Sequence, residues 1–285
     1  MIARSTDLPE KVGVVGGGRM GAGIAHAFLT AGCTVVVVDI SQDAAQAARE
    51  RIELSVEKSL AKGLEGDKET ILQRLDTTAD YRSLAGCSLV IEAVPEDFSL
   101  KARTFSTIAE HAPGAVIASN TSSLSISDLA ETVDDPDRVV GLHFFNPVPA
   151  SKLIEIVRAR HTPEELVATA VGWVKALSKT PVVVRDCPGF ASSRLGLAIA
   201  LEAMRMVEED VASAEDIDNA MVLGYKFPIG PLALTDLVGL DVRLGIAEYL
   251  HSTLGERFRP PEILRRKVAE GELGKKTGAG FYRYD

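Results

Sequence analysis

A histidine and a glutamate in neighbouring apolar runs are the residues of this chain best suited to acid/base chemistry. His143 ends the mostly apolar run 139–142, and Glu155 lies twelve residues further on in a second apolar run. A neutral imidazole can take a proton from a hydroxyl group near pH 7, and a carboxylate on its other nitrogen fixes the tautomer and stabilises the imidazolium. The pair therefore suits the oxidation of an alcohol. The alternative is a histidine that is simply buried in a core.

A glycine-rich turn near the start of the chain predicts a dinucleotide site. Gly16, Gly18 and Gly21 form the pattern Gly-x-Gly-x-x-Gly between the apolar run 12–15 and a helical pattern over 22–29. In this pattern the first glycine permits the tight turn, the second lets backbone approach a pyrophosphate, and the third lets helix and strand pack closely. We count two residues inside the turn, Arg19 and Met20, with the cofactor-binding residues.

Asp39 favours NAD over NADP. It ends the β-branched run 35–38, eighteen residues after Gly21, near the spacing at which a carboxylate accepts the ribose hydroxyls. Its charge would repel a 2′-phosphate, and the residues 40–42 include no arginine to receive one. The alternative is a glycine-rich turn without a ligand, in which Asp39 only caps a helix.

Hydroxyl groups at residues 119–123 follow another predicted strand. We expect Ser122 and its neighbours to face the same carboxyl edge of the sheet as His143. For any one of them the alternative is an ordinary N-cap of the helix that begins near Leu124.

The order of the predicted elements indicates an α/β fold with a Rossmann-type, doubly wound, mostly parallel sheet. A second, smaller, all-α domain follows, because after Asp186 helical patterns separated by short Gly/Pro turns replace the β-branched runs. We predict a domain 1–186 with the NAD site and the His/Glu pair, and a helical domain 187–285. Predicted strands cover 12–15, 35–38, 88–92, 115–118, 139–145, 153–157 and 182–184, and predicted helices cover 22–29, 42–62 and 100–111.

Composition limits the partners. The 285 residues suffice for two domains, and a net charge of −9 disfavours nucleic acid and anionic membranes. Three scattered cysteines suggest neither disulfides nor a metal site, and we see no secretion signal near the start and no membrane-spanning run. We expect a cytoplasmic protein. The charges of residues 57–73 fit a solvated helical face.

Seven segments occur together in one order along the chain: Gly16–Gly21, Val90–Glu96, Ala118–Ser123, His143–Pro147, Pro188–Phe190, Glu215–Asp218 and Gly274–Gly278. In these segments the chain resembles the L-3-hydroxyacyl-CoA dehydrogenase family, including the 3-hydroxybutyryl-CoA dehydrogenases. The resemblance extends from Lys11 to Tyr284. It implies reversible NAD-dependent oxidation of a 3-hydroxyacyl-CoA to the 3-oxoacyl-CoA in fatty acid or butanoate metabolism, by a homodimer formed through the helical domain.

The resemblance also implies roles for individual residues. His143 would be the catalytic base and Glu155 its partner, with Ser122 beside the substrate hydroxyl. Contacts with NAD are implied for Glu96, Lys101, Asn146 and Lys276, and contacts with coenzyme A for Ser55 and Lys62. The last two shift our interpretation of the charged helix from a solvated face towards a binding role, since a phosphate-bearing ligand on an acidic protein needs local lysines.

One departure from the family pattern concerns substrate preference. Ser193 stands before Arg194 where the family usually has asparagine, and it is counted here with the catalytic residues. A serine hydroxyl reaches less far than an amide and offers one donor. Two alternatives therefore stay open: a related dehydrogenase for a different 3-hydroxy substrate, either a free hydroxy acid or a carrier-bound acyl group, and a non-catalytic NAD-binding protein.

Overall fold

The structure, a computed structural model, describes residues 8–284, and the chain divides into two compact units between Asp186 and Cys187. Residues 1–7, where we expect no secretion signal, lie outside the described range. No described helix is both long enough and apolar enough to cross a membrane. Within residues 8–284 no group of three or more His, Cys, Asp or Glu residues is arranged to hold a metal ion.

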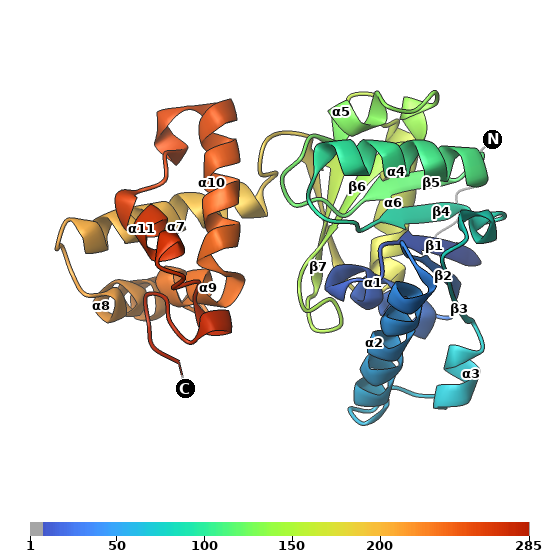
Figure 1. The fold of residues 1–285 in the computed structure, drawn as a ribbon, viewed down its shortest axis with the longest axis horizontal. Coiled ribbons are helices and arrows are strands. Elements are labelled where there is room, and N and C mark those ends of the chain that lie inside the picture. Colours follow the sequence, from blue (N-terminus) through green and yellow to red (C-terminus); the bar gives the residue numbers. More distant parts are fainter. Residues whose placement is uncertain (1–7, 285) are drawn as a thin grey trace. The chain divides into compact units, whose positions relative to one another are not determined.

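The N-terminal unit is built on one eight-stranded sheet (Figure 1). The strands are β1 (Lys11–Val15), β2 (Thr34–Val38), β3 (Leu75–Thr78), β4 (Leu89–Glu92), β5 (Val116–Ser119), β6 (Val139–Phe144), β7 (Leu153–Arg158) and β8 (Thr180–Arg185). Their order is β3-β2-β1-β4-β5-β6-β7-β8. Neighbours are parallel except β6 and β7, which are antiparallel. The predicted doubly wound, mostly parallel α/β fold is confirmed.

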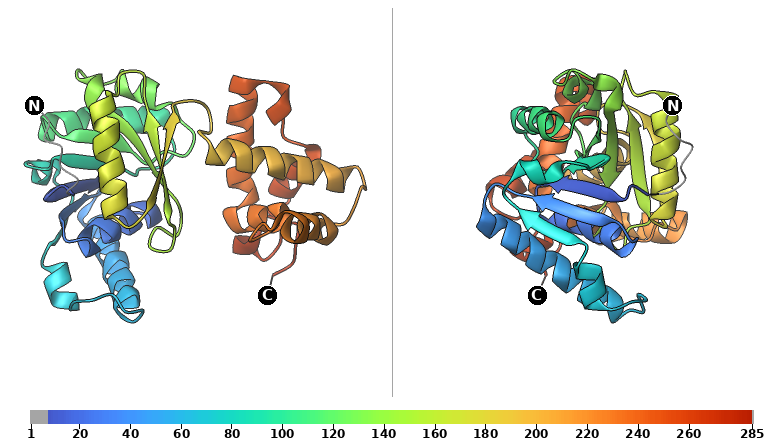
Figure 2. Two further views of the ribbon diagram at one scale, coloured as in Figure 1. Left: turned by 180° about the vertical axis from the view of Figure 1, so that it is seen from behind. Right: turned by 90° about the vertical axis from the view of Figure 1, so that its right-hand side faces the viewer.

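Helices cover both faces of this sheet. They are α1 (Arg19–Thr30), α2 (Gln42–Leu60), α3 (Lys68–Leu72), α4 (Phe98–His111), α5 (Ile126–Ala130) and α6 (Glu164–Ala176). The right-hand view of Figure 2 shows α4 and α6 on opposite sides of the strands. Side chains cap several of the helices: Ser41 accepts the amide of Ala44, and Asp97 accepts the amide of Leu100.

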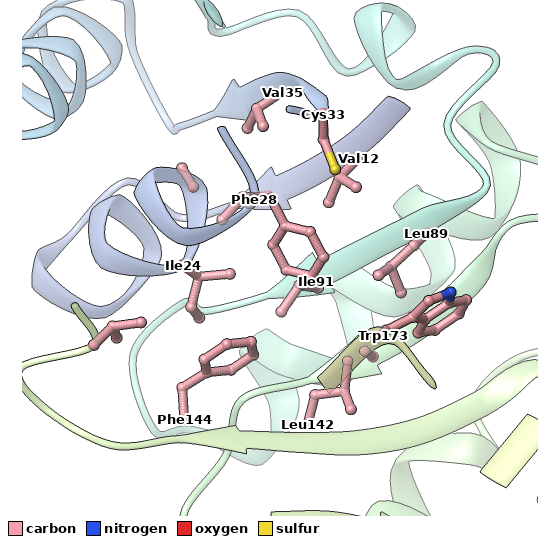
Figure 3. Close-up of a cluster of buried hydrophobic side chains, with 14 of the residues drawn as sticks. Val12, Ile24, Phe28, Cys33, Val35, Leu89, Ile91, Leu142, Phe144 and Trp173 are labelled. Atoms are coloured by element: carbon pink, nitrogen blue, oxygen red, sulfur yellow. The ribbon is translucent and has the colours of Figure 1, made fainter. Parts of the chain in front are cut away.

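A hydrophobic cluster joins α1, α2 and α6 to one face of the sheet (Figure 3). Phe28 of α1 meets Phe144 of β6 with ring centroids 6.4 Å apart, and Trp173 of α6 lies in the same cluster. Full burial of one such side chain stabilises a fold by roughly 1.5–3 kcal/mol. Because Phe144 directly follows His143, this packing also fixes the strand end that carries the histidine.

A strand and an α-helix of this unit, β3 and α6, were not predicted from the sequence. β3 has only four residues, and its sequence Leu-Asp-Thr-Thr has little apolar content. It forms because its backbone pairs in parallel with β2 at the edge of the sheet. α6 begins after Pro163 without a side-chain cap, so its start lacks the usual polar signal.

The C-terminal unit is helical, and the prediction of helices in this region is confirmed. Its helices are α7 (Ser192–Glu208), α8 (Ala214–Asn219), α9 (Pro231–Val238), α10 (Leu240–Leu254) and α11 (Glu262–Ala269). Two buried aspartates hold it together. Asp218 accepts the amides of Leu232 and Ala233 at the start of α9, each at 2.8 Å. Asp236 accepts the amides of Phe281 and Tyr282 and so fastens the end of the chain to α9.

Candidate active site

The glycine-rich turn has the geometry of a phosphate site. Gly16 has φ +94°, which L side chains rarely adopt, and a Cβ on Gly21 would lie 1.7 Å from the carbonyl oxygen of Gly16. A Cβ on Gly18, in contrast, would meet no atom within 4 Å among the described residues, so its backbone faces open space. Gly18 precedes α1, which has no side-chain cap, and the first amides of α1 can therefore donate to a phosphate.

The two other residues of the turn separate in the structure. Arg19 lines an open cleft beside α1, whereas Met20 packs against the hydrophobic cluster. Gly17 has a packing role that the sequence did not reveal, because a Cβ there would lie 2.3 Å from the Cβ of Ala48 in α2.

Asp39 lies at the carboxyl end of β2, beside the turn. Its Oδ2 accepts the amide of Gly17 at 2.7 Å, and its Oδ1 accepts the amide of Ile40 at 2.7 Å. A carboxylate has about four lone-pair positions, so each oxygen can still accept a ribose hydroxyl. The side chain of Ile40 is 92% exposed, which leaves an apolar surface next to this carboxylate.

His143 and Glu155 are direct cross-strand neighbours. The antiparallel register of β6 and β7 pairs the two residues, and Nδ1 of His143 donates to Oε2 of Glu155 at 2.8 Å. His143 is 6% exposed and Glu155 is 1% exposed. With its proton on Nδ1, the neutral imidazole has its acceptor lone pair on Nε2. The arrangement is that of a general base held by a carboxylate.

Asn120 connects the polar segment after β5 to the histidine strand. Its Oδ1 accepts the amide of Phe144 at 2.9 Å, directly after His143. The segment that contains Ser122 is thus fixed next to the end of β6. Asn120 was not predicted as a site residue, although its place between Ser119 and Thr121 in a polar run was an available signal.

Glu96 accepts hydrogen bonds from the polar groups around Ser122. It accepts the hydroxyl of Thr121 at 2.5 Å, the amide of Ser122 at 3.1 Å and the hydroxyl of Ser123 at 3.2 Å. The hydroxyl of Ser122 lies 3.5 Å from the same oxygen. The structure therefore brings together two predicted site residues from different elements, Glu96 and Ser122.

Lys101 is buried behind Glu96. Its Nζ donates to Oε1 of Glu92 at 2.7 Å and to the carbonyl of Val94 at 3.0 Å, and it lies 3.3 Å from Oε2 of Glu96. The three N–H groups of the ammonium thus have three protein acceptors. Direct contact between Lys101 and NAD would require one of them to be given up, so the structure favours a positioning role through Glu96.

The pKa values of Glu92 and Glu96 are shifted in opposite directions in this network. Burial raises the pKa of Glu92, and Lys101 offsets that effect only in part. Burial also raises the pKa of Glu96, but the charge of Lys101 and the hydrogen bonds from Thr121 and Ser122 outweigh it and hold the pKa below its ordinary value. Glu96 therefore stays ionised at neutral pH, next to Ser122.

A cleft of about 600 Å³ lies between α2 and the loop that follows β6. It brings together four predicted site residues: Arg19, Ser55, Lys62 and Asn146. Arg51 and Lys58 line the same cleft, and neither was predicted from the sequence. The signal was present, because positions 51, 55, 58 and 62 repeat with the period of one helix face.

The cleft loop is fixed by a lysine without any sequence signal. Lys179 donates from Nζ to the carbonyl of Val148 at 2.7 Å and to that of Ser151 at 2.5 Å. Burial lowers the pKa of this ammonium. Val148 is itself buried against Gly23 of α1, where a Cβ would lie 2.9 Å from it. Asn146 therefore projects from a loop held at two points.

Two predicted site residues belong to the helical unit. Ser193 lies half-buried in the first turn of α7. Lys276 donates from Nζ to both carboxylate oxygens of Asp241, at 2.6 and 2.7 Å. Burial raises the pKa of Asp241, but its bonds with Lys276 and with the amide of Val242 hold the pKa below its ordinary value.

Comparison with known proteins matches both units of the chain to one enzyme family. The NAD binding domain of 3-hydroxyacyl-CoA dehydrogenase matches residues 11–187, and the C-terminal domain of the same enzyme matches residues 189–284. A probable 3-hydroxybutyryl-CoA dehydrogenase from Bacillus subtilis is 40% identical over 280 residues, covering 97% of this chain and 98% of that protein.

Relatives of wider origin show the same similarity. The human mitochondrial hydroxyacyl-coenzyme A dehydrogenase is 40% identical over 289 residues, covering 96% of this chain and 91% of the human protein. The crystal structure of (S)-3-hydroxybutyryl-CoA dehydrogenase from Ralstonia eutropha superposes with a TM-score of 0.93 at 39% identity, covering 98% of this chain and 100% of that one. The chain therefore belongs to the 3-hydroxyacyl-CoA dehydrogenase family.

Proposed function

We propose that the protein reversibly oxidises an L-3-hydroxyacyl-CoA, such as 3-hydroxybutyryl-CoA, to the 3-oxoacyl-CoA in fatty acid or butanoate metabolism. Membership of the family supports the reaction. The observation that carries the residue assignment is the 2.8 Å bond between His143 and Glu155 at the end of the NAD-binding sheet. NAD, when bound, accepts the hydride that leaves C3 of the substrate.

In this proposal the chain holds NAD at the edge of β1 and β2. Backbone amides after Gly18 receive the pyrophosphate, for which the open space at Gly18 leaves room, and Asp39 accepts the ribose hydroxyls. Glu96 and Asn146 belong to the same unit as β1 and β2, and in this proposal they contact NAD near its nicotinamide end. A contact of Lys276 with NAD stays a prediction from the family resemblance.

The proton leaves the substrate by way of the histidine. Nε2 of His143 takes the proton of the C3 hydroxyl as the C–H bond breaks, and Glu155 stabilises the imidazolium that forms. Ser122 donates a hydrogen bond to the reacting oxygen. Two electrons and one proton leave as hydride, a second proton rests on His143, and the ketone remains.

Coenzyme A occupies the cleft along α2 in this proposal. Ser55 and Lys62 line it together with Arg51 and Lys58. Among the described residues these cations form no ion pair with a carboxylate, so their charge can act on the phosphates of the ligand. Local cations are needed because the chain as a whole carries a net charge of −9.

The test of the base is His143→Gln. Loss of the base should lower kcat for 3-hydroxybutyryl-CoA by roughly 10²–10⁴-fold, while the affinity for NAD is retained. NADH absorbance gives the rate, and fluorescence titration gives the affinity. An unchanged kcat in a variant that still binds NAD would exclude His143 as the base.

A second candidate is a dehydrogenase for a different 3-hydroxy substrate, a free acid or a carrier-bound acyl group, and the serine at position 193 favours keeping it. Lys62→Ala distinguishes the two. An enzyme for coenzyme A thioesters should show KM raised by roughly tenfold, because one charge-assisted contact is lost. An enzyme for a free hydroxy acid should show an unchanged KM in the Lys62→Ala variant.

Lys68→Ala serves as the matched control for Lys62→Ala. Lys68 is also a lysine with an exposed side chain and lies at the start of α3, but it pairs with Glu57 and does not line the cleft. Equal effects of both substitutions would point to a general loss of positive charge.

The non-catalytic alternative predicts no NADH from any of these substrates.

We also propose a homodimer formed through the helical unit. Large apolar side chains are exposed on that unit, among them Leu195, Leu223, Tyr225 and Leu237. These side chains support the proposal, because exposed apolar side chains that gather into one patch mark an interaction surface.

A further inference from the structure

Arg51 of α2 connects the cleft to the glycine-rich turn. It lines the cleft, and its Nη1 donates to the carbonyl oxygen of Gly17 at 3.3 Å. The cleft and the turn also adjoin at α1, because Arg19 lines the cleft and is the first residue of that helix. All of these residues belong to the unit whose sequence matches an NAD binding domain. One cation thus reaches from the cleft to the turn of the dinucleotide site.

The bond from Arg51 orients a peptide group of that turn. The dihedral angles between two glycines are unusually free, so the peptide group of Gly17 and Gly18 needs outside contacts to keep one orientation. On one side Asp39 accepts the amide of Gly17 at 2.7 Å, and on the other Arg51 donates to its carbonyl. In a planar trans peptide the carbonyl and the following N–H point in opposite directions. Arg51 therefore also sets the direction of the N–H of Gly18.

The charges that line the cleft favour a ligand with phosphate groups. The cleft has a volume of about 600 Å³, and its lining includes four cations: Arg19, Arg51, Lys58 and Lys62. Within residues 8–284 none of the four forms an ion pair with a carboxylate. Such a group of cations is a local exception on a chain with a net charge of −9. Phosphate oxygens accept strong hydrogen bonds from ammonium and guanidinium groups.

The guanidinium of Arg51 has enough donors for both places. It carries five N–H groups, and the bond to Gly17 uses one of them. Because the side chain is exposed, holding it against Gly17 costs rotamer freedom. A phosphate in the cleft would restrict the same side chain. The ligand that binds second then meets an arginine that is already ordered.

We infer that Arg51 is a positioning residue that couples the two ligands of this unit. A phosphate-bearing ligand in the cleft raises the affinity for NAD, and NAD raises the affinity for that ligand by the same factor. This role deepens the proposed function and rests on it, because coenzyme A is taken as the ligand of the cleft. Without Arg51 the two ligands no longer support each other, and their negative charges repel.

The coupling is measured by binding to the full chain, without catalysis. NADH fluorescence gives the Kd of NADH in the absence and in the presence of saturating coenzyme A, which has no acyl group to react. In the wild type coenzyme A should lower this Kd at least about fivefold. Titration of coenzyme A with and without NADH should give the same factor. Adenosine 3′,5′-bisphosphate, a probe with phosphates and no thiol arm, should act in the same direction.

Arg51→Met tests the residue itself. It removes the charge and the bond to Gly17, so the ratio of the two Kd values of NADH should fall to one or below. Arg51→Lys keeps the charge, but an ammonium lacks the planar fork that can face the carbonyl and a phosphate together, so the ratio should be intermediate. Equal unfolding temperatures of the wild type and the variants show that the exposed position tolerates the changes.

Lys58→Met is the matched control. Lys58 lines the same cleft two helical turns further along α2, and within the described part of the chain it donates no hydrogen bond to the turn. Its substitution should weaken coenzyme A while the Kd ratio of NADH, measured at saturation, stays at the wild-type value. A ratio lost equally in Lys58→Met would assign the coupling to the total charge of the cleft and overturn the role of Arg51.

The remaining outcomes separate this role from the proposed function. A wild-type ratio of one, or a ratio retained in Arg51→Met, overturns the coupling through Arg51, while NADH formation from 3-hydroxybutyryl-CoA upholds the proposed function. If coenzyme A does not bind and its thioesters yield no NADH, both are wrong.

Discussion

At the scale of single residues, the proposed chemistry depends on a hydrogen bond that connects two strands. The backbone register brings His143 and Glu155 opposite each other, and both side chains are nearly excluded from water. A buried carboxylate exerts its field on the ring with little screening. Glu155 therefore orients the base and supports it electrostatically.

Glu155→Gln tests this support. A glutamine has no negative charge to stabilise the imidazolium, and its amide can select the wrong tautomer of His143. We expect kcat to fall by roughly 10²–10⁴-fold while KM changes little. Steady-state kinetics measure both parameters.

Glu164→Gln is the matched control for this measurement. Glu164 pairs with Arg158 at the surface of the same unit, so its substitution changes charge without touching the histidine. A Glu155→Gln variant as active as this control would remove Glu155 from the mechanism.

The residue types explain which site members could be predicted. His143 and Asp39 have side chains whose chemistry few positions require, and the glycines stand where a side chain would clash. Such residues can be recognised in the sequence. Lys179 gave no such signal, because a lysine before a strand is ordinary in sequence. Its role depends on burial and on backbone carbonyls, which only the folded chain reveals.

At the scale of elements, α1 and α2 are joined by a buried polar contact. Nε2 of His26 in α1 lies 2.9 Å from the hydroxyl of Ser59 in α2. Nδ1 of His26 is buried and has no hydrogen-bond partner among the described residues. Burial lowers the pKa of this imidazole, and the charge of Lys179 lowers it further. Both helices border the cleft, so this contact sets their spacing there.

The lowered pKa of His26 makes stability depend on pH. The folded state binds the proton more weakly than the unfolded chain, whose histidine has its pKa near 6.5. The stabilising effect of the neutral imidazole is thus fully present above pH 6.5 and is lost as the pH falls from 6.5 through the folded-state pKa. The slope reaches at most about 1.4 kcal/mol per pH unit.

Urea unfolding between pH 8 and 5.5 measures this effect. The wild type should lose unfolding free energy below pH 6.5 relative to His26→Gln. His161→Gln, at an exposed histidine, should follow the wild type. Parallel curves for the wild type and His26→Gln would contradict the assignment.

Element types were easier to predict than element pairing. The apolar runs 12–15 and 35–38 indicated strands, and the structure has β1 and β2 there, each buried at four of its five residues. The edge strand β3 lacked that pattern because one side of its backbone has no neighbouring strand. The antiparallel direction of β7 has no local signal either, since it follows from the return of the chain after the loop 145–152.

At the scale of the whole molecule, the proposed homodimer is testable through the apolar side chains of the helical unit. Leu237 is 60% exposed, and a charge at this position would be buried in a dimer formed there. We expect a dimer by light scattering in the wild type and a shift towards monomer for Leu237→Lys.

Leu54→Lys is the matched control, because Leu54 is 50% exposed but lies on α2 of the other unit. It should leave the mass unchanged. A monomeric wild type at working concentrations would refute the homodimer, and equal effects of both variants would place the contact elsewhere.

The antiparallel pairing of β6 with β7 has a consequence for how such proteins vary in evolution and in engineering. The His–Glu pair is set by strand register and not by the loop between the two strands, whose own role is to line the cleft. Residues can be inserted into or deleted from that loop without separating the pair. A one-residue slip within β7, in contrast, would turn Glu155 to the opposite face of the sheet. The spacing of twelve residues is therefore a poor search pattern for this site, and strand-aligned positions are a better one.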